Sequence, residues 1–154
     1  MIILGIDPGI ARMGWGVVEE IKQKARAMAY GCFETPAAMG HADRLAAVHK
    51  ELARLIKLHK PERVAVEKLF FSKNVKTALQ VGEARGVIML TCAELNVPVF
   101  EISPKEVKQA LTGYGGADKH QMQRMVQLML SLRELPRPDD AADALAIAIA
   151  GARL

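Results

Sequence analysis

Short apolar runs separated by turn residues predict three consecutive β-strands at the start of the chain. The runs cover residues 2–6, 14–18 and 27–33, and each has the length of a typical strand. Asp7-Pro8-Gly9 follows the first run, and a charged segment at 22–24 separates the second from the third. Because proline, glycine and clustered polar residues favour turns, these strands should form a β-meander.

Beyond residue 40 the apolar positions recur every three or four residues, which predicts helices with two further strands between them. Ser103-Pro-Lys-Glu106 has the pattern of a capping box with proline in the first turn, and Asp118 is a suitable N-cap for the next helix. The expected elements are helices over 41–59, about 74–95, 103–113, 118–132 and from 140 onward, and strands over 63–67 and 97–102.

This order of elements indicates an α/β fold. Three strands, then alternating helices and strands, then helices alone, suit a five-stranded mixed sheet with helices on both faces. The ribonuclease H-like fold has the same order. The chain has 154 residues, enough for a sizeable core but short for two domains, so residues 1–154 should form a single domain.

Four acidic residues lie where this fold could bring them together. Asp7 and Glu67 each end an apolar run, and Asp140 and Asp143 share one face at the start of the last helix. Converging carboxylates repel one another unless cations lie between them. Oxygen ligands without a thiolate or paired imidazoles suit Mg²⁺ or Mn²⁺, so the first hypothesis is metal-assisted phosphodiester chemistry.

Each acid also has a purely structural explanation. Asp7-Pro8-Gly9 is a common turn sequence, and Glu67 beside Lys68 could simply be solvated. Carboxylates in the first turn of a helix are favoured by the helix dipole in any protein. The catalytic interpretation therefore depends on the combination, because three distant segments each place an acid where the predicted topology makes their ends meet.

Charge and composition narrow the choice of partner and compartment. The net charge is +4, and residues 105–137 contain six basic and three acidic side chains, so most of the excess lies there and would suit a polyanion. Cys32 and Cys92 lack metal or redox spacing, and we expect both to be buried small hydrophobic residues. The chain begins without an export signal, and its longest apolar stretch, 144–152, is too short to span a bilayer. A cytoplasmic location is therefore expected.

An ordered set of motifs resembles the RuvC family of Holliday-junction resolvases, and the resemblance covers nearly the whole chain. The first motif alone is only moderately specific for this family, since other nucleases and actin-like ATPases begin with related sequences. The whole set of motifs at these spacings is highly specific for it. The motifs are Ile3-Leu-Gly-Ile-Asp-Pro-Gly9, Val64-Ala-Val-Glu67, Ala84-Arg-Gly86, Val107-Lys-Gln109 and Asp140-Ala-Ala-Asp-Ala-Leu-Ala-Ile147.

The resemblance implies that Asp7, Glu67, Asp140 and Asp143 form a catalytic tetrad that binds two Mg²⁺ ions, or Mn²⁺, in each active site. The ions would bracket the scissile phosphate, activate the attacking water and neutralise the leaving oxygen. Two consecutive aspartates, Asp139 and Asp140, stand where the family pattern requires only one. The spacing selects Asp140 and leaves Asp139 as a helix cap or a spare ligand.

The resemblance also implies contacts with DNA. Lys119 and Lys108 match basic positions, with a catalytic charge-neutralising role for Lys119 as well, although either could lie on a solvated helix face. Phe70 matches a position whose ring stacks on a base at the junction centre, and Phe71 beside it could instead pack under the following helix. Ser72, Lys73 and Asn74 could contact phosphates, and Arg85 either contacts phosphate or pairs within its own helix.

Paired cuts on opposing strands of a four-way junction require two related active sites, so a homodimer is expected. The resemblance implies packing through the helix at 74–95, although its apolar stripe could simply cover the sheet. That stripe consists of Val81, Ala84, Val87, Ile88 and Leu95. Functional coupling to the RuvA and RuvB branch-migration complex is implied in the same way.

The resulting prediction is a structure-selective endonuclease that resolves four-way DNA junctions in recombination and repair. One alternative is another ribonuclease H-like nuclease, such as one that processes ribosomal RNA precursors. A different class is a protein that binds junctions without cutting them. A junction-binding protein that does not cut is disfavoured, because four carboxylates facing DNA would weaken DNA binding in the absence of metal.

Overall fold

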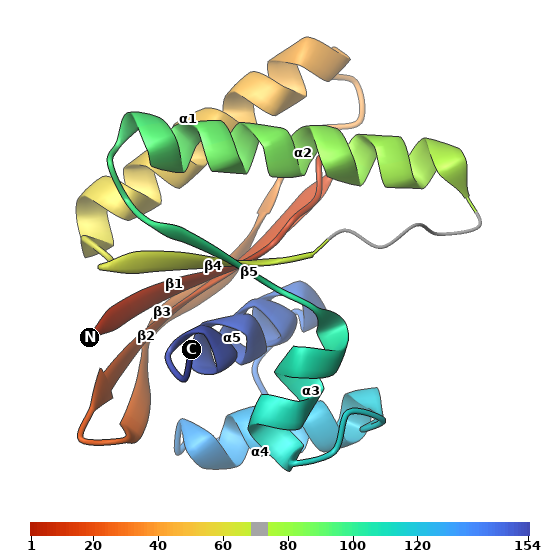
Figure 1. Cartoon of the computed structure of the whole chain (residues 1–154). Helices are drawn as coiled ribbons and strands as arrows, with labels where there is room; N and C mark the ends of the chain where they lie inside the picture. The colour runs from red at the N-terminus through yellow and green to blue at the C-terminus, as the bar shows by residue number, and fades with distance from the viewer. Residues whose placement is uncertain (69–73) are drawn as a thin grey trace.

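A five-stranded mixed sheet forms the centre of the computed structural model, which describes residues 1–68 and 74–154 (Figure 1). The strands lie in the order β3-β2-β1-β4-β5. β1, β2 and β3 form an antiparallel meander, whereas β4 pairs with β1 in parallel and β5 pairs with β4 in parallel. Their bounds are β1 Ile2–Asp7, β2 Arg12–Ile21, β3 Lys24–Glu34, β4 Arg63–Glu67 and β5 Val99–Ile102.

In the described residues five helices cover the two faces of the sheet, as the sequence predicts. α1 and α2 lie together on one face, and α3, α4 and α5 lie on the other (Figure 1). Their bounds are α1 His41–His59, α2 Val75–Glu94, α3 Pro104–Thr112, α4 Lys119–Met129 and α5 Asp139–Gly151. Within the described part of the chain, no helix is long and apolar enough to cross a membrane.

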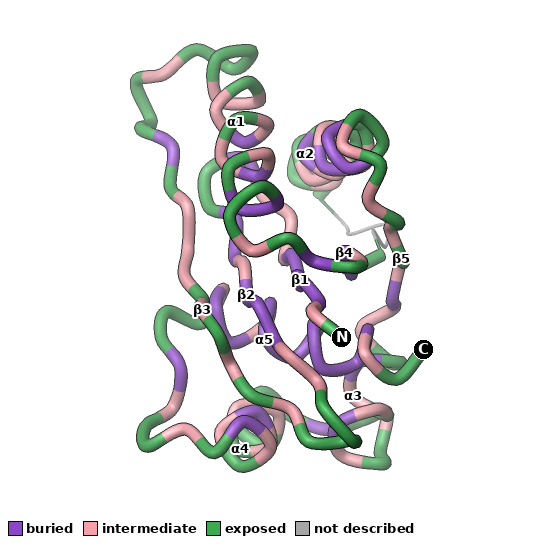
Figure 2. Tube along the Cα trace, turned by 90° about the vertical axis from the view of Figure 1, so that its left-hand side faces the viewer, coloured by how far each residue is buried: buried purple, intermediate pink, exposed green. Residues whose placement is uncertain are grey.

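α5 is the central helix of the second face, and almost all of its residues are buried (Figure 2). It packs closely on the sheet because the strand positions beneath it are glycines. A Cβ atom on Gly5 would overlap the backbone of α5 at Ala144 and Ala148, and one on Gly16 would press on Leu145. The small residues of β1 and β2 therefore decide how near the start of α5 comes to the strand ends.

The element bounds differ from the sequence prediction in a few places. β2 and β3 are longer than their apolar runs because Lys22 and Gln23, both with positive φ, form a two-residue turn that lets the strands pair up to it. The fourth helix ends at Met129 rather than near 132, and Ser131 has a φ of 52°. Helix geometry cannot continue through a left-handed residue.

The predicted capping box at Ser103 and the predicted N-cap at Asp118 are both present, and Asp118 also forms a capping box. The Ser103 hydroxyl accepts from the amide of Glu106, and the Glu106 carboxylate accepts from the amide of Ser103. Asp118 and Gln121 make the same reciprocal pair at the start of α4. The starts of α3 and α4 are thereby fixed at Pro104 and Lys119.

Candidate active site

Asp7 and Glu67 lie side by side at the ends of two neighbouring parallel strands. Ile6 pairs with Val66 in the register of β1 and β4, so the next residue of each strand is one of the two acids. Side chains alternate between the faces of a sheet. Because Gly5 lies directly beneath α5, the residue two positions later, Asp7, points to the same face, where the first turn of α5 begins.

The first turn of α5 lies over the end of the β-meander next to Asp7. Gly14 is the partner of Asp7 on β2, and a Cβ atom on Gly14 would overlap the carbonyl oxygen of Asp140. This approach places Asp140, and Asp143 one turn later, close to the strand ends. Three segments far apart in sequence therefore bring four carboxylates together, as the sequence predicts.

The electrostatics of this cluster show that its charges interact. Burial, followed by the negative charges of Glu67, Asp143 and Asp140, raises the pKa of Asp7 from 3.8 to about 7. Burial is also the largest cause of the raised pKa values of Glu67 and Asp143, and the charge of Asp143 adds to the effect at Glu67. Ionising Asp7, Glu67 and Asp143 together is thus costly, and added positive charge would favour it.

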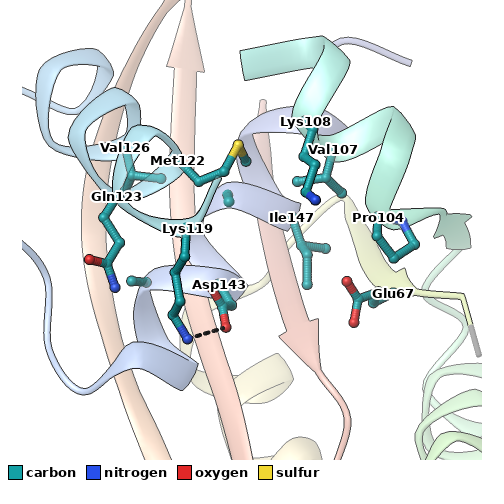
Figure 3. A pocket seen from close by; sticks show the side chains of 12 residues that line it. Glu67, Pro104, Val107, Lys108, Lys119, Met122, Gln123, Val126, Asp143 and Ile147 are labelled. Atoms are coloured by element: carbon teal, nitrogen blue, oxygen red, sulfur yellow. Dashed lines mark ion pairs between the residues drawn. The ribbon is translucent and has the colours of Figure 1, made fainter. Parts of the chain in front are cut away.

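Two basic side chains of the protein already neutralise part of the cluster. Lys119 Nζ lies 3.1 Å from Asp139 Oδ2 and 3.9 Å from Asp143 Oδ2, the second of these contacts being the dashed line in Figure 3. Arg12 Nε donates to Asp140 Oδ2 at 2.9 Å. The sequence prediction included Lys119 but missed Arg12, whose position at the start of β2, five residues after Asp7, is the only sequence signal for it.

The two consecutive aspartates take different roles. Asp139 is the first residue of α5, after Pro138 as N-cap, so its expected role as a helix cap is wrong. Its carboxylate accepts from Lys119, which lowers its pKa, and it also accepts from Gln123 at 3.2 Å. Asp140 is the one whose charge acts on Asp7. The geometry therefore favours Asp140 as the third member of the tetrad.

A cavity of about 210 Å³ opens beside the acids, between α3, α4 and α5 (Figure 3). Glu67, Asp143, Lys108 and Lys119 line it together with apolar side chains. Lys108 lowers the pKa of Glu67 by its positive charge, although burial prevails and the net shift is upward. Both predicted lysines thus lie next to the acids.

The donor set of the cluster suits hard divalent cations, since all four side chains supply carboxylate oxygens. Among the residues that the structure describes, no three histidine, cysteine, aspartate or glutamate side chains are arranged to enclose a metal ion. Two of the acids instead contact basic side chains, Asp140 through Arg12 and Asp143 through Lys119. The carboxylates therefore suit divalent ions by the chemistry of their oxygen donors.

Other predicted site residues fare differently. Phe70, Phe71 and Lys73, with Ser72, lie outside the described residues. Asn74 caps α2, with its side chain accepting from the amide of Thr77 at 3.3 Å.

Two further expectations need correction. Cys32 is only half-buried and lies near Asp140, in contrast to the buried Cys92. Arg85 forms an ion pair with Glu101 on β5, not with a residue of its own helix.

Comparisons with known proteins agree with this arrangement. The sequence pattern of the family described as Crossover junction endodeoxyribonuclease RuvC matches residues 3–151. A protein of that name from Roseiflexus sp. (strain RS-1) is 57% identical over 146 residues, covering 95% of this chain and 87% of its own. One from Chloroflexus aurantiacus is 56% identical over 149 residues, covering 97% and 91%.

Among solved structures, Thermus thermophilus RuvC in complex with a Holliday junction substrate superimposes with a TM-score of 0.94 and 39% identity, over 99% of this chain and 93% of that one. The yeast mitochondrial Holliday junction resolvase, at 15% identity and a TM-score of 0.65, shares the fold. The predicted ribonuclease H-like fold is thereby confirmed.

Proposed function

Since this chain belongs to the RuvC family of crossover junction endodeoxyribonucleases, we propose that it resolves four-way DNA junctions at the cluster of Asp7, Glu67, Asp140 and Asp143. One observation carries this assignment to the cluster: burial and three neighbouring carboxylates raise the pKa of Asp7 to about 7. A group of acids that is costly to ionise together is typical of a site that functions with bound cations.

The proposed cofactor is a pair of Mg²⁺ ions, with Mn²⁺ as a substitute, held by the four carboxylates. When bound, the ions supply an activated water and neutralise the leaving 3′-oxygen. The chain contributes the frame: β1 and β4 hold Asp7 and Glu67 side by side, and α5 presents Asp140 and Asp143. Lys119 and Lys108 at the cavity would hold the phosphate and offset its charge.

The proposal is tested by incubating the purified protein with a synthetic four-way DNA junction, with Mg²⁺ or with EDTA. We expect paired nicks at related positions only with Mg²⁺, and junction binding under both conditions. A linear duplex of the same sequence and a structured RNA are the matched controls. Preferential cleavage of the RNA would favour the ribosomal-RNA-processing alternative, and binding without scission under any metal would favour a junction-binding protein.

We also propose that the protein acts as a homodimer through the outer side of α2. Ala84 and Ile88, which the sequence suggested for this role, are fully buried against the rest of the chain, so they belong to the core. The opposite side of α2 carries exposed apolar residues, with Leu79 63% and Leu90 57% exposed. Gly86 lies between them, and a Cβ atom there would meet nothing within 4 Å.

This arrangement supports a second copy of α2 as the occupant of that side. A glycine flanked by leucines lets two helices approach closely while apolar side chains pack around the contact. Two copies also supply the two active sites that paired cuts on a symmetric junction require. Family membership supports two further proposals, coupling to the RuvA and RuvB branch-migration complex and a cytoplasmic location, where bacterial DNA is found. Stimulation of junction cleavage by added RuvA and RuvB tests the first.

A further inference from the structure

Arg12 links three segments of the chain at the edge of the acidic cluster. It is the Cα partner of Glu34 in the β2–β3 ladder, and its guanidinium lies 3.0 Å from Glu34 Oε1. Its Nε donates to Asp140 Oδ2 at 2.9 Å, the length of a charge-assisted hydrogen bond. One side chain thereby ties the first turn of α5 to the ends of β2 and β3.

The two oxygens of Asp140 are consequently not equivalent. Oδ2 accepts from Arg12 and lies 3.9 Å from the Cys32 thiol, both of which come from the meander. Over residues 1–68 and 74–154, no hydrogen bond to Oδ1 is found. A carboxylate can accept at either oxygen, so fixing Oδ2 leaves Oδ1 as the atom available to a metal ion.

We propose that Arg12 is a positioning residue that holds Asp140 by Oδ2, so that Asp140 offers a single oxygen, Oδ1, to a divalent ion. This inference rests on the proposed function, because it assumes that Asp140 is a metal ligand. Partners that orient a metal ligand from behind commonly change metal affinity by 10- to 100-fold when removed.

An exposed ion pair would ordinarily contribute little, and Arg12 and Asp140 are 47% and 31% exposed. Here the first turn of α5 packs tightly on β2, because Gly14 lies directly beneath the carbonyl of Asp140. Glu34 restrains the Arg12 side chain from the other side, and a network of three charges holds one geometry better than an isolated pair.

Two other roles for Arg12 predict different changes in metal affinity when Arg12 is removed. If Arg12 merely competes with metal for Asp140, its removal should tighten metal binding, since a positive charge leaves the site. If Arg12 instead binds DNA, its removal should weaken junction binding in EDTA and leave metal affinity unchanged. The sign of the change in metal affinity therefore distinguishes positioning from both.

The experiment is calorimetric titration of metal-free protein with Mn²⁺, comparing wild type with Arg12→Met, Arg12→Lys and Glu34→Gln. Arg26→Met is the matched control, because Arg26 also pairs through Nε with a carboxylate, Glu19, on the same sheet but away from the acids. We expect Arg12→Met to raise the Kd for Mn²⁺ about tenfold or more. Arg12→Lys should recover part of the loss, since lysine keeps the charge but not the two-pronged geometry.

Two further measurements separate positioning from general destabilisation. For Arg12→Met, the Mg²⁺ concentration for half-maximal nicking should rise about tenfold, with a much smaller change in rate at saturating Mg²⁺. Glu34→Gln does not touch Asp140, so it keeps the inference testable if Arg12→Met fails to fold. Glu34→Gln should raise the Kd for Mn²⁺ by a smaller factor than Arg12→Met does. If Arg12 instead binds DNA, Glu34→Gln should tighten junction binding in EDTA.

The failure of this inference is distinguishable from that of the proposed function. If wild-type protein binds no Mn²⁺, the proposed function fails and this inference with it. If wild type binds Mn²⁺ and Arg12→Met binds it equally well or more tightly, the positioning role alone is overturned. The same holds if Arg26→Met weakens Mn²⁺ binding as much as Arg12→Met does.

Discussion

Asp7 and Asp139 have the same side chain and lie in the same site, yet the fold shifts their pKa values in opposite directions. Burial and three nearby carboxylates raise the pKa of Asp7. The hydrogen bond from Lys119 is the largest cause of the lowered pKa of Asp139. At the scale of single residues, the chemistry of an acid therefore depends on depth and neighbours rather than on residue type.

Glu67→Gln is expected to abolish nicking while leaving junction binding in EDTA within a few-fold of wild type. Glutamine keeps the shape and the hydrogen-bonding oxygen but loses the charge that would hold a divalent cation. Gel-based cleavage and binding assays on the same junction measure both effects. Glu62→Gln, on the loop before β4, is the control and should cut normally. Undiminished cleavage by Glu67→Gln would remove Glu67 from the mechanism.

The raised pKa of Asp7 predicts how stability depends on pH in metal-free protein. Between pH 3.8 and about 7 the folded state holds a proton at Asp7 that the unfolded state has released. The free energy of unfolding therefore falls as pH rises through that window and then levels off. The rise in the pKa of Asp7 from 3.8 to about 7 corresponds to at most roughly 4 kcal/mol of unfolding free energy, because Glu67 and Asp143 contribute to the same rise.

Asp7→Asn should remove this dependence and make metal-free protein more stable than wild type at pH 8, but not at pH 4. Urea denaturation in EDTA at a series of pH values measures the difference. Mg²⁺ should restore wild-type stability at pH 8 and have little effect on Asp7→Asn. A wild-type curve that rises from pH 4 to pH 7 relative to Asp7→Asn would contradict the assignment.

At the scale of elements, the site depends on how closely α5 approaches the meander. Gly5 and Gly14 occupy strand positions directly beneath its backbone. Gly16 similarly accommodates Leu145. These glycines carry no catalytic chemistry, but they determine the distance between the acids on α5 and those on the strands. The packing of one helix thus controls the geometry of the whole cluster.

Gly5→Ala should lower the free energy of unfolding by about 3 kcal/mol or more, because its Cβ would overlap rigid backbone rather than a flexible side-chain end. Gly115→Ala is the matched control, since a Cβ atom there would meet only the flexible side chain of Lys105 and should change the free energy of unfolding by less than about 1 kcal/mol. Urea denaturation at one protein concentration compares them. A Gly5→Ala protein as stable as wild type would show that α5 can move outward at little cost.

At the scale of the whole molecule, one chain presents one acidic cluster, whereas a four-way junction offers two related strands. In the described part of the chain α1 packs beside α2, as Figure 1 shows, while Leu79 and Leu90 of α2 stay exposed. The proposed dimer therefore uses surface that the fold leaves available, and it would place two clusters in one particle.

Replacing Leu79 and Leu90 together by glutamate should convert the protein from dimer to monomer, because four charges would be buried in the contact. Light scattering after size exclusion measures the mass. Leu58→Glu is the matched control, since Leu58 is 61% exposed on α1 and should leave the mass unchanged. On a cruciform plasmid the double variant should give nicked circles instead of linear product. A double variant that remains dimeric would place the interface elsewhere.

The order and type of every helix and strand followed from local signals that need no tertiary context. Apolar periodicity separated helices from strands, and the capping box at Ser103 and the N-cap at Asp118 marked the starts of two helices to the residue. The positions of the four acids at strand ends and at one helix start were visible for the same reason. Boundaries were less exact where a turn or a left-handed residue, such as Ser131, decides the end.

Only the tertiary structure decided which charged side chains lie next to each other. The sequence selected Asp140 over Asp139 by spacing alone, and packing then gave the two different partners, Lys119 for Asp139 and Arg12 for Asp140. It also left open whether the apolar stripe of α2 covers the sheet, and burial assigned Ala84 and Ile88 of that stripe to the core. Periodicity depends on neighbours along the chain, which a sequence contains. The pairing of Arg12 with Asp140 joins residues 128 positions apart, and such contacts exist only once the sheet and α5 have packed.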